Sequence, residues 1–137
     1  MNPVVHFEMP YKDKNRAAAF YQSAFGWKPQ MLGPEMGEYV VMQTGETDEK
    51  GMLKSPGMIN GGMYKKPSDP NGAAPSFVIA VDDIQAAIKK VGEAGGTIIG
   101  SSAGAGVPET IPGIGLHISI RDTEGNRVSL LQPAPRM

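Results

Sequence analysis

Apolar residues recur along this chain with two spacings that alternate in a repeating order. Residues 4–9 alternate between apolar and polar side chains, which predicts a strand. A helix is predicted next, because Asp13 favours an N-cap, Gly26 favours a helix end, and the apolar residues between them follow a helical spacing. Those residues are Ala17, Phe20, Tyr21, Ala24 and Phe25. Strands are then predicted at residues 27–32, 38–44 and 58–65, which completes a β-α-β-β-β order.

The same order begins again in the second half of the chain. A strand is predicted at residues 75–81, a helix from Asp83 to the pair Gly95-Gly96, and strands at residues 97–100, 115–121 and 126–132. Four residues of the first half reappear about seventy residues later: Asp13, Ala17, Ala24 and Gly26 return as Asp83, Ala87, Ala94 and Gly96. A repeat of this length predicts two copies of one supersecondary unit packed as one domain. The Gly- and Pro-rich segment 101–113 is predicted to be a loop, either a lid or binding edge or a flexible spacer.

Composition narrows the classes of partner. The 137 residues include 13 basic and 14 acidic side chains, so no net charge favours nucleic acid or an anionic membrane. A small neutral or mixed-charge molecule fits better. The absence of cysteine excludes disulfides, thiolate metal sites and a cysteine nucleophile. The first residues lack a basic segment followed by an apolar stretch, and no apolar run approaches the roughly 20 residues needed to span a bilayer, so a cytoplasmic location is expected.

Strand alternation separates an apolar face from a polar one. The apolar face is predicted to meet the helices, and it carries Val5, Phe7, Met9, Phe77, Ile79, Val81, Leu116, Ile118, Ile120, Val128 and Leu130. The polar face is predicted to line a ligand cavity, with the alternative that it simply meets water. Its residues are His6, Glu8, Ser76, His117, Ser119, Arg121 and Ser129.

Four phrases of the chain carry a resemblance to a known family: VVHFEMP, AAAFYQSAFGW, VDDIQAAIKKVGEAGG and RDTEGNRVSLLQP. Together they resemble the vicinal oxygen chelate superfamily, which contains glyoxalase I, bleomycin-resistance proteins and extradiol dioxygenases. The resemblance implies an α+β fold in which paired βαβββ modules form an open, cup-shaped mixed barrel with the helices outside and the ligand site inside. It implies one glyoxalase-like domain over residues 1–137, with modules at about 1–66 and 75–133, and a homodimer.

The resemblance also implies where a metal would be held. Metal-using members take ligands from the first and last strands of each module, which here places His6, Gly61 or Gly62, Ser76 and Ser129 at those positions. Only the histidine has ligand chemistry, whereas a catalytic divalent ion needs about three such side chains. We therefore expect no metal and no other cofactor. A displaced metal site built from His6, Glu8 and His117 is the alternative.

The function expected from these features is metal-independent binding of a small molecule. Tyr39 and Trp27 could add stacking surface and Arg121 could hold an anionic group, although Trp27 could equally pack in the core and Arg121 could pair with Asp122. The first alternative is a glyoxalase-like lyase, isomerase or epimerase in which His6 and Glu8, two apart on one strand, act as a general-base pair. The second is a structural or regulatory dimerisation module whose cup is filled by side chains such as Met63 and Leu131. The adjacent glycines Gly61 and Gly62 predict a bulge or a close approach to the sheet. The sequence leaves the identity of the ligand open.

Overall fold

Each half of the chain folds around one helix and its own set of strands. The structure is a computed structural model that describes residues 1–135, with Asn71 described by its backbone alone. Two compact units divide the chain: the first unit is His6–Pro75, and the second unit contains Met1–Val5 together with the chain from Ser76 onward. The α+β class is confirmed, and both halves have the βαβββ order, to which the second half adds the two short strands Gly104–Ala105 and Glu109–Ile111. That both units form one domain stays a prediction.

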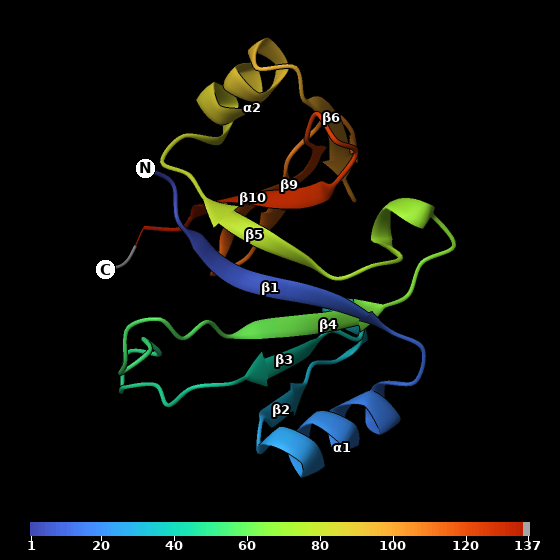
Figure 1. Cartoon of the computed structure of the whole chain (residues 1–137), viewed down its shortest axis with the longest axis vertical. Helices are drawn as coiled ribbons and strands as arrows, with labels where there is room; N and C mark the ends of the chain where they lie inside the picture. The colour runs from blue at the N-terminus through green and yellow to red at the C-terminus, as the bar shows by residue number, and fades with distance from the viewer. Residues whose placement is uncertain (136–137) are drawn as a thin grey trace. The chain divides into compact units, whose positions relative to one another are not determined.

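The first unit contains β1 (Val4–Tyr11, which begins in the second unit), α1 (Lys14–Phe25), β2 (Lys28–Met31), β3 (Val40–Gln43) and β4 (Gly61–Lys65). Short 3-10 helices lie at Pro34–Met36 and Pro70–Gly72. Its strands are ordered β2-β3-β4-β1, with β1 and β4 parallel and the other pairs antiparallel. Figure 1 shows α1 beside β2 and β4 beside β1.

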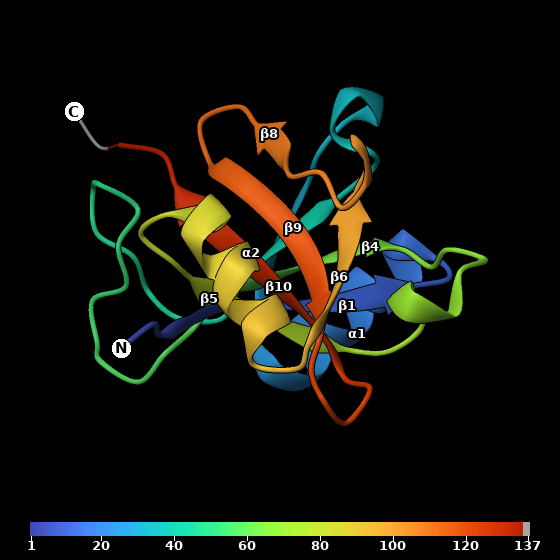
Figure 2. The same ribbon diagram turned by 90° about the horizontal axis from the view of Figure 1, so that it is seen from above.

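The second unit contains β5 (Ser76–Ala80), α2 (Ile84–Glu93), β6 (Thr97–Ser101), β7 (Gly104–Ala105), β8 (Glu109–Ile111), β9 (Gly115–Arg121) and β10 (Arg127–Pro133). Its strands are ordered β5-β10-β9-β6-β7, and β8 also pairs with β9. Helix α2 contacts β6, β9 and β10, and Figure 2 shows it in front of β10.

Segment 101–113 is therefore not the plain loop that its composition predicts. It contains β7 and β8, of two and three residues. Strands this short have no readable alternation, so their pairing with β6 and β9 decides that they form. The structure consequently holds this segment to the sheet by backbone hydrogen bonds at both of its ends.

Both helices begin where the sequence predicts. Asp13 accepts a hydrogen bond from the backbone N–H of Arg16, and Asp83 accepts from Gln85 and Ala86. The first helix ends at Gly26, whose φ of +74° is the left-handed conformation that glycine adopts easily. In the second half the left-handed residue is Gly95, with φ of +97°, one position earlier than the repeat predicts.

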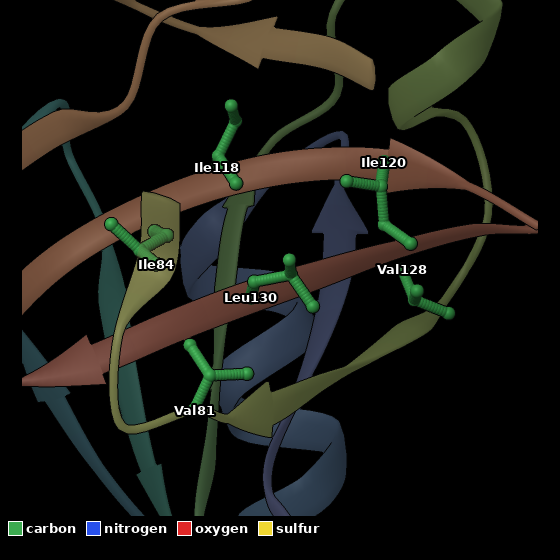
Figure 3. Close-up of a cluster of buried hydrophobic side chains, with 6 residues drawn as sticks. All are labelled: Val81, Ile84, Ile118, Ile120, Val128 and Leu130. Atoms are coloured by element: carbon green, nitrogen blue, oxygen red, sulfur yellow. The ribbon is translucent and has the colours of Figure 1, made fainter. Parts of the chain in front are cut away.

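The predicted apolar face forms most of the core of the second unit, whereas in the first unit it contributes only Phe7 and Met9, which pack against the buried residues. In the second unit six buried side chains pack together, as Figure 3 shows: Val81, Ile84, Ile118, Ile120, Val128 and Leu130. In the first unit Tyr11, Val40, Met42 and Met63 are buried, and Phe7, Met9, Ala17, Tyr21 and Trp27 pack against them.

The pattern is wrong at some positions near element ends. Phe77 is 42% exposed and Val5 is 38% exposed, although both were expected to meet a helix. The core against α2 includes Ile79 of β5 and Val81, which follows β5, so Phe77 near the start of the strand lies outside it. Phe20 and Phe25 of α1 are also more than half exposed, because Ala17 and Tyr21 supply the contacts to the core. No helix among the described residues is long and apolar enough to cross a membrane.

Candidate functional site

A connected group of three polar side chains lies in the first unit, on the face of β1 opposite the core. The hydroxyl of Tyr39 lies 3.0 Å from Nε2 of His6 and 3.3 Å from Oε2 of Glu8, to which it donates a hydrogen bond. Because a phenol has one hydrogen and Tyr39 gives it to the carboxylate, the hydrogen between His6 and Tyr39 belongs to Nε2 of the imidazole. The three residues form one chain of hydrogen bonds, which we call the Tyr39 cluster.

Strand alternation and a glycine together place these side chains. His6 and Glu8 are two apart on β1, so they share a face, while Phe7 and Met9 face the core. Gly62 of β4 is directly opposite Glu8, and a Cβ atom there would overlap the phenol ring of Tyr39. The ring of Tyr39 therefore lies over bare backbone, with its hydroxyl directed at the two residues of the neighbouring strand.

The Tyr39 hydroxyl stays protonated in this setting. Burial raises the pKa of Tyr39 well above its ordinary value, and the negative charge of Glu8 raises it further. Ionisation of the phenol would place a second negative charge against the carboxylate. The cluster thus offers one fixed hydroxyl, one imidazole and one carboxylate, a combination able to bind oxygen-rich groups or to move a proton.

The glycine pair forms no bulge. The pairing of β1 with β4 continues without interruption from Phe7 and Gly61 to Tyr11 and Lys65. The close approach predicted for these glycines is present, but the groups that approach them are aromatic rings of this same chain. A Cβ at Gly61 would overlap the ring of Phe7, as one at Gly62 would overlap Tyr39.

In the second unit, His117 on β9 pairs with a residue that sequence reasoning missed. Oε1 of Glu109 lies 3.0 Å from Nδ1 of His117, and the other carboxylate oxygen accepts a hydrogen bond from the hydroxyl of Ser102. Glu109 reaches the histidine because β8 pairs directly with β9 at these two residues. The one sequence signal for it is an acidic residue in a segment that is otherwise mostly uncharged.

The remaining predicted residues of the second unit share one face of β9 and β10. Ser119 lies opposite Ser129, and Arg121 lies opposite Arg127. Ser129 is fully buried, and its hydroxyl has no hydrogen-bond partner among residues 1–135. Arg127, which the site prediction omitted, donates a hydrogen bond of 2.9 Å to the hydroxyl of Ser76. The second unit therefore has its own set of polar side chains, among which the hydroxyl of Ser129 is buried without a hydrogen-bond partner among the described residues.

The structure thus brings together the predicted site residues within each unit. The first unit joins His6, Glu8 and Tyr39, and the second aligns His117, Ser119, Arg121 and Ser129 on one face while Arg127 holds Ser76. That these residues bind one common ligand stays a prediction.

The structure decides the roles of three single residues: Trp27, Asp122 and Met63. Trp27 is a core residue, because its ring stacks on Tyr21 at a centroid distance of 4.7 Å and packs against the core of the first unit. Among the described residues, Asp122 forms no ion pair with Arg121. Its carboxylate accepts hydrogen bonds from Glu124 and Asn126 inside the turn between β9 and β10. Met63 is 1% exposed and lies in the core on the helix side, so it does not fill the polar face.

The metal-ligand positions implied by the family resemblance do not fit a metal ion. Nε2 of His6 is engaged with Tyr39, Gly61 and Gly62 have no side-chain ligand atom, and serine hydroxyls replace the other two ligands. Across residues 1–135 no group of three or more His, Cys, Asp or Glu side chains is arranged to hold a metal ion. The displaced set His6, Glu8 and His117 is therefore not arranged to hold one either.

Comparisons with known proteins agree with this architecture. Residues 4–45 match the family described as bleomycin resistance protein-like N-terminal. The candidate glyoxylase CFP32 of Mycobacterium tuberculosis is 30% identical over 121 residues, which are 88% of this chain and 40% of that protein. The chain therefore spans about two fifths of the length of that relative. A glyoxylase-like domain-containing protein of Didymella fabae is 33% identical over 121 residues, which cover 87% of this chain and 84% of the relative.

A solved structure shows the same fold. A variant of methylmalonyl-CoA epimerase from Streptomyces coelicolor, in complex with 2-nitronate-propionyl-CoA, superposes with a TM-score of 0.67 at 12% sequence identity. The match covers 98% of this chain and 96% of the epimerase. At this identity the likeness concerns the fold alone.

Proposed function

The chain belongs to the glyoxalase/bleomycin resistance/dioxygenase superfamily, and from that premise we propose that it binds a small, oxygen-rich or anionic molecule without a metal ion. The observation that carries this proposal is the Tyr39 cluster, in which a hydroxyl, an imidazole and a carboxylate are fixed on the strand face opposite the core. Polar groups held in a defined geometry are what fix the orientation of a ligand.

The second unit supports the same class of ligand. Ser119, which lies opposite the buried Ser129, is half-buried, so its hydroxyl can reach a ligand oxygen or amide. The guanidinium of Arg121, on the same face, suits a carboxylate or phosphate group. The epimerase with the same fold is described in complex with an acyl-CoA analogue, so this architecture accommodates small molecules with acidic groups.

A ligand screen followed by calorimetry tests the proposal. Thermal-shift screening of small carboxylates, phosphates and sugars identifies a ligand, and titration calorimetry then compares the parent protein with Arg121→Ala and His6→Ala. We expect each variant to lose about 1.5–3 kcal/mol of binding free energy, the range for hydrogen bonds to charged groups. Lys28→Ala removes an exposed lysine of β2 and serves as the control with unchanged affinity. Unchanged affinity in both site variants would contradict the proposal.

The metal-independent part has its own measurement. Plasma emission spectroscopy of protein purified without chelator should detect no stoichiometric divalent metal. The affinity for the ligand should also be unchanged after dialysis against EDTA. One metal ion per chain that is lost in His6→Ala would overturn this part and favour a metal-dependent lyase.

A second candidate function is proton transfer by His6 and Glu8, as in a glyoxalase-like lyase, isomerase or epimerase. The specific observation in its favour is that Tyr39 connects the imidazole to the carboxylate, so a proton gained by His6 is stabilised by the charge of Glu8. Incubation of carbonyl ligands from the screen in deuterated water, followed by NMR, should show exchange of a hydrogen next to the carbonyl. Exchange that persists in Glu8→Gln would remove the pair from the mechanism.

Self-association belongs to the same proposal. The strands at the sheet ends, β2 in the first unit and β7 in the second, have unpaired edges, and edges of this kind are commonly covered by another chain. Light scattering at micromolar concentration should therefore give about twice the chain mass of 14.5 kDa. A single-chain mass at all concentrations would refute the homodimer.

A further inference from the structure

A hollow of about 480 Å³ lies in the first unit on the helix side of its strands, away from the Tyr39 cluster. Strand β1, helix α1 and the residue before β5 surround it. Its walls include Met9, Ala17, Phe20, Tyr21, Met63 and Pro75. Met9 faces the core side of β1 whereas Glu8 faces the other side, so this hollow and the Tyr39 cluster are separate features.

On α1 the wall of the hollow includes one small side chain. Residues 17–19 of the helix are three alanines in succession, and Ala17 is the one that lines the hollow. Phe20, three residues further along α1, also lines the hollow. Its side chain is 57% exposed, so a large apolar ring is in contact with water. An apolar ligand body would cover that ring and gain the free energy of removing its surface from water.

The rim of the hollow has a net positive charge. Lys12 and Arg16 line it and are exposed, and within residues 1–135 neither side chain forms an ion pair. Asp13 is the one acidic residue on the rim, and one of its oxygens already accepts the backbone N–H of Arg16 as the N-cap. The ammonium of Lys14, one position further, is neutralised by Glu38. An anionic group at this rim therefore meets two cations that form no ion pair with any carboxylate of the described residues.

From this combination we propose that the hollow is a second binding site, for a small amphipathic anion with an apolar body and one carboxylate or sulfonate group. The apolar body lies against Ala17, Phe20 and Met63, and the anionic group lies between Lys12 and Arg16. The volume is within the range of pockets that hold small organic molecules. The site is independent of the proposed function, because it shares no residue with the polar face of either unit.

A matched pair of fluorescent probes tests the site. Anilinonaphthalenesulfonate has an apolar body and one sulfonate, and N-phenylnaphthylamine has the same rings without the charge. We expect the sulfonate to bind once per chain, at least fivefold more tightly than the neutral probe. Arg16→Gln and Lys12→Gln should each weaken sulfonate binding about two- to fivefold, the effect of one exposed charge pair. Both should leave the affinity for the neutral probe unchanged.

A variant that fills the hollow separates this site from adventitious binding elsewhere. Ala17→Leu should weaken both probes tenfold or more, with near-ultraviolet circular dichroism confirming the folded state. Phe20→Ala, at an exposed position, removes one wall and should weaken both probes even if Ala17→Leu fails to fold. Lys28→Gln removes a positive charge outside the hollow and is the control without effect. Equal binding of the two probes, or sulfonate affinity unchanged in Arg16→Gln and Phe20→Ala, would overturn the proposal.

Discussion

Substituting Gly62 tests whether the Tyr39 cluster depends on a missing side chain. In Gly62→Ala the three heavy atoms nearest to the new methyl group all belong to the phenol ring and hydroxyl of Tyr39, and all overlap with it. The ring must therefore move, which breaks its contacts with His6 and Glu8. Forcing an extra methyl group into a packed position costs about 1–3 kcal/mol of the free energy of unfolding.

A double-mutant cycle isolates that cause. In a Tyr39→Ala background the space above Gly62 is empty, so the added methyl group should cost close to nothing, and the coupling energy should equal most of the single-mutant cost. Gly92→Ala is the matched control. Gly92 lies in α2 with no atom within 4 Å of its added Cβ, and alanine is there expected to stabilise by about 0.5–1 kcal/mol.

Urea unfolding followed by circular dichroism measures all four variants of the cycle, together with the Gly92→Ala control. NMR of the His6 ring adds a local readout, because its resonances should shift both in Gly62→Ala and in Tyr39→Phe. An equal cost of Gly62→Ala with and without the tyrosine ring would refute the reasoning, since the penalty would then arise from the β4 backbone rather than from Tyr39.

Three further predictions concern the helix N-caps, the end of β3 and the Tyr39 hydroxyl. Asp13→Ala and Asp83→Ala should each cost about 0.5–2 kcal/mol in urea unfolding, with the larger cost at Asp83, which accepts two backbone N–H groups instead of one; a larger cost at Asp13 would contradict this. Asn60→Ala should cost about 1–3 kcal/mol, because one amide oxygen holds two backbone N–H groups at the end of β3, whereas Asn60→Asp keeps the acceptor and should cost less. The pKa of Tyr39 is raised in the folded state, so above the ordinary value of 10.0 the phenol ionises in unfolded chains while it stays protonated in folded ones. The free energy of unfolding should therefore fall as pH rises above 10.0, by up to about 1.4 kcal/mol per pH unit. Tyr39→Phe should flatten that alkaline decline, and a decline of the same steepness in the variant would assign it to other groups.

The sequence predicts the helices and longer strands well because their signals are local. The N-cap aspartates, the glycine near each helix end and the alternation in residues 115–121 each act within a few residues, and the structure follows them almost position by position. The offset of Gly95 from the repeat arises for the opposite reason. Which of two adjacent glycines takes the left-handed conformation depends on how the chain continues into β6, and either residue permits it.

The partners within the site depend on pairing across strands, which local pattern does not reveal. Glu109 reaches His117 only because β8 pairs with β9, and β8 has three residues. The alternation predicted correctly that His117 and Ser119 share a face, but it had no means of showing that Ser129 would be fully buried and Arg121 only half-buried. Long-range register, rather than residue type, decides both outcomes.

The glycine at position 62 links the absence of a metal-ligand side chain on β4 to the Tyr39 cluster of the first unit. At the position where metal-using relatives are expected to carry a ligand, this chain has no side chain, and the phenol of Tyr39 from the adjacent β3 end occupies the space above Gly62. Its hydroxyl lies 3.0 Å from Nε2 of His6. Placing a glutamate or histidine at position 62 would displace the ring and disrupt the hydrogen bonds of Tyr39 with Glu8 and His6. The absence of a side chain at position 62 and the hydrogen-bonded Tyr39 cluster thus depend on each other, which is why we expect the polar face to recognise its ligand through hydrogen bonds.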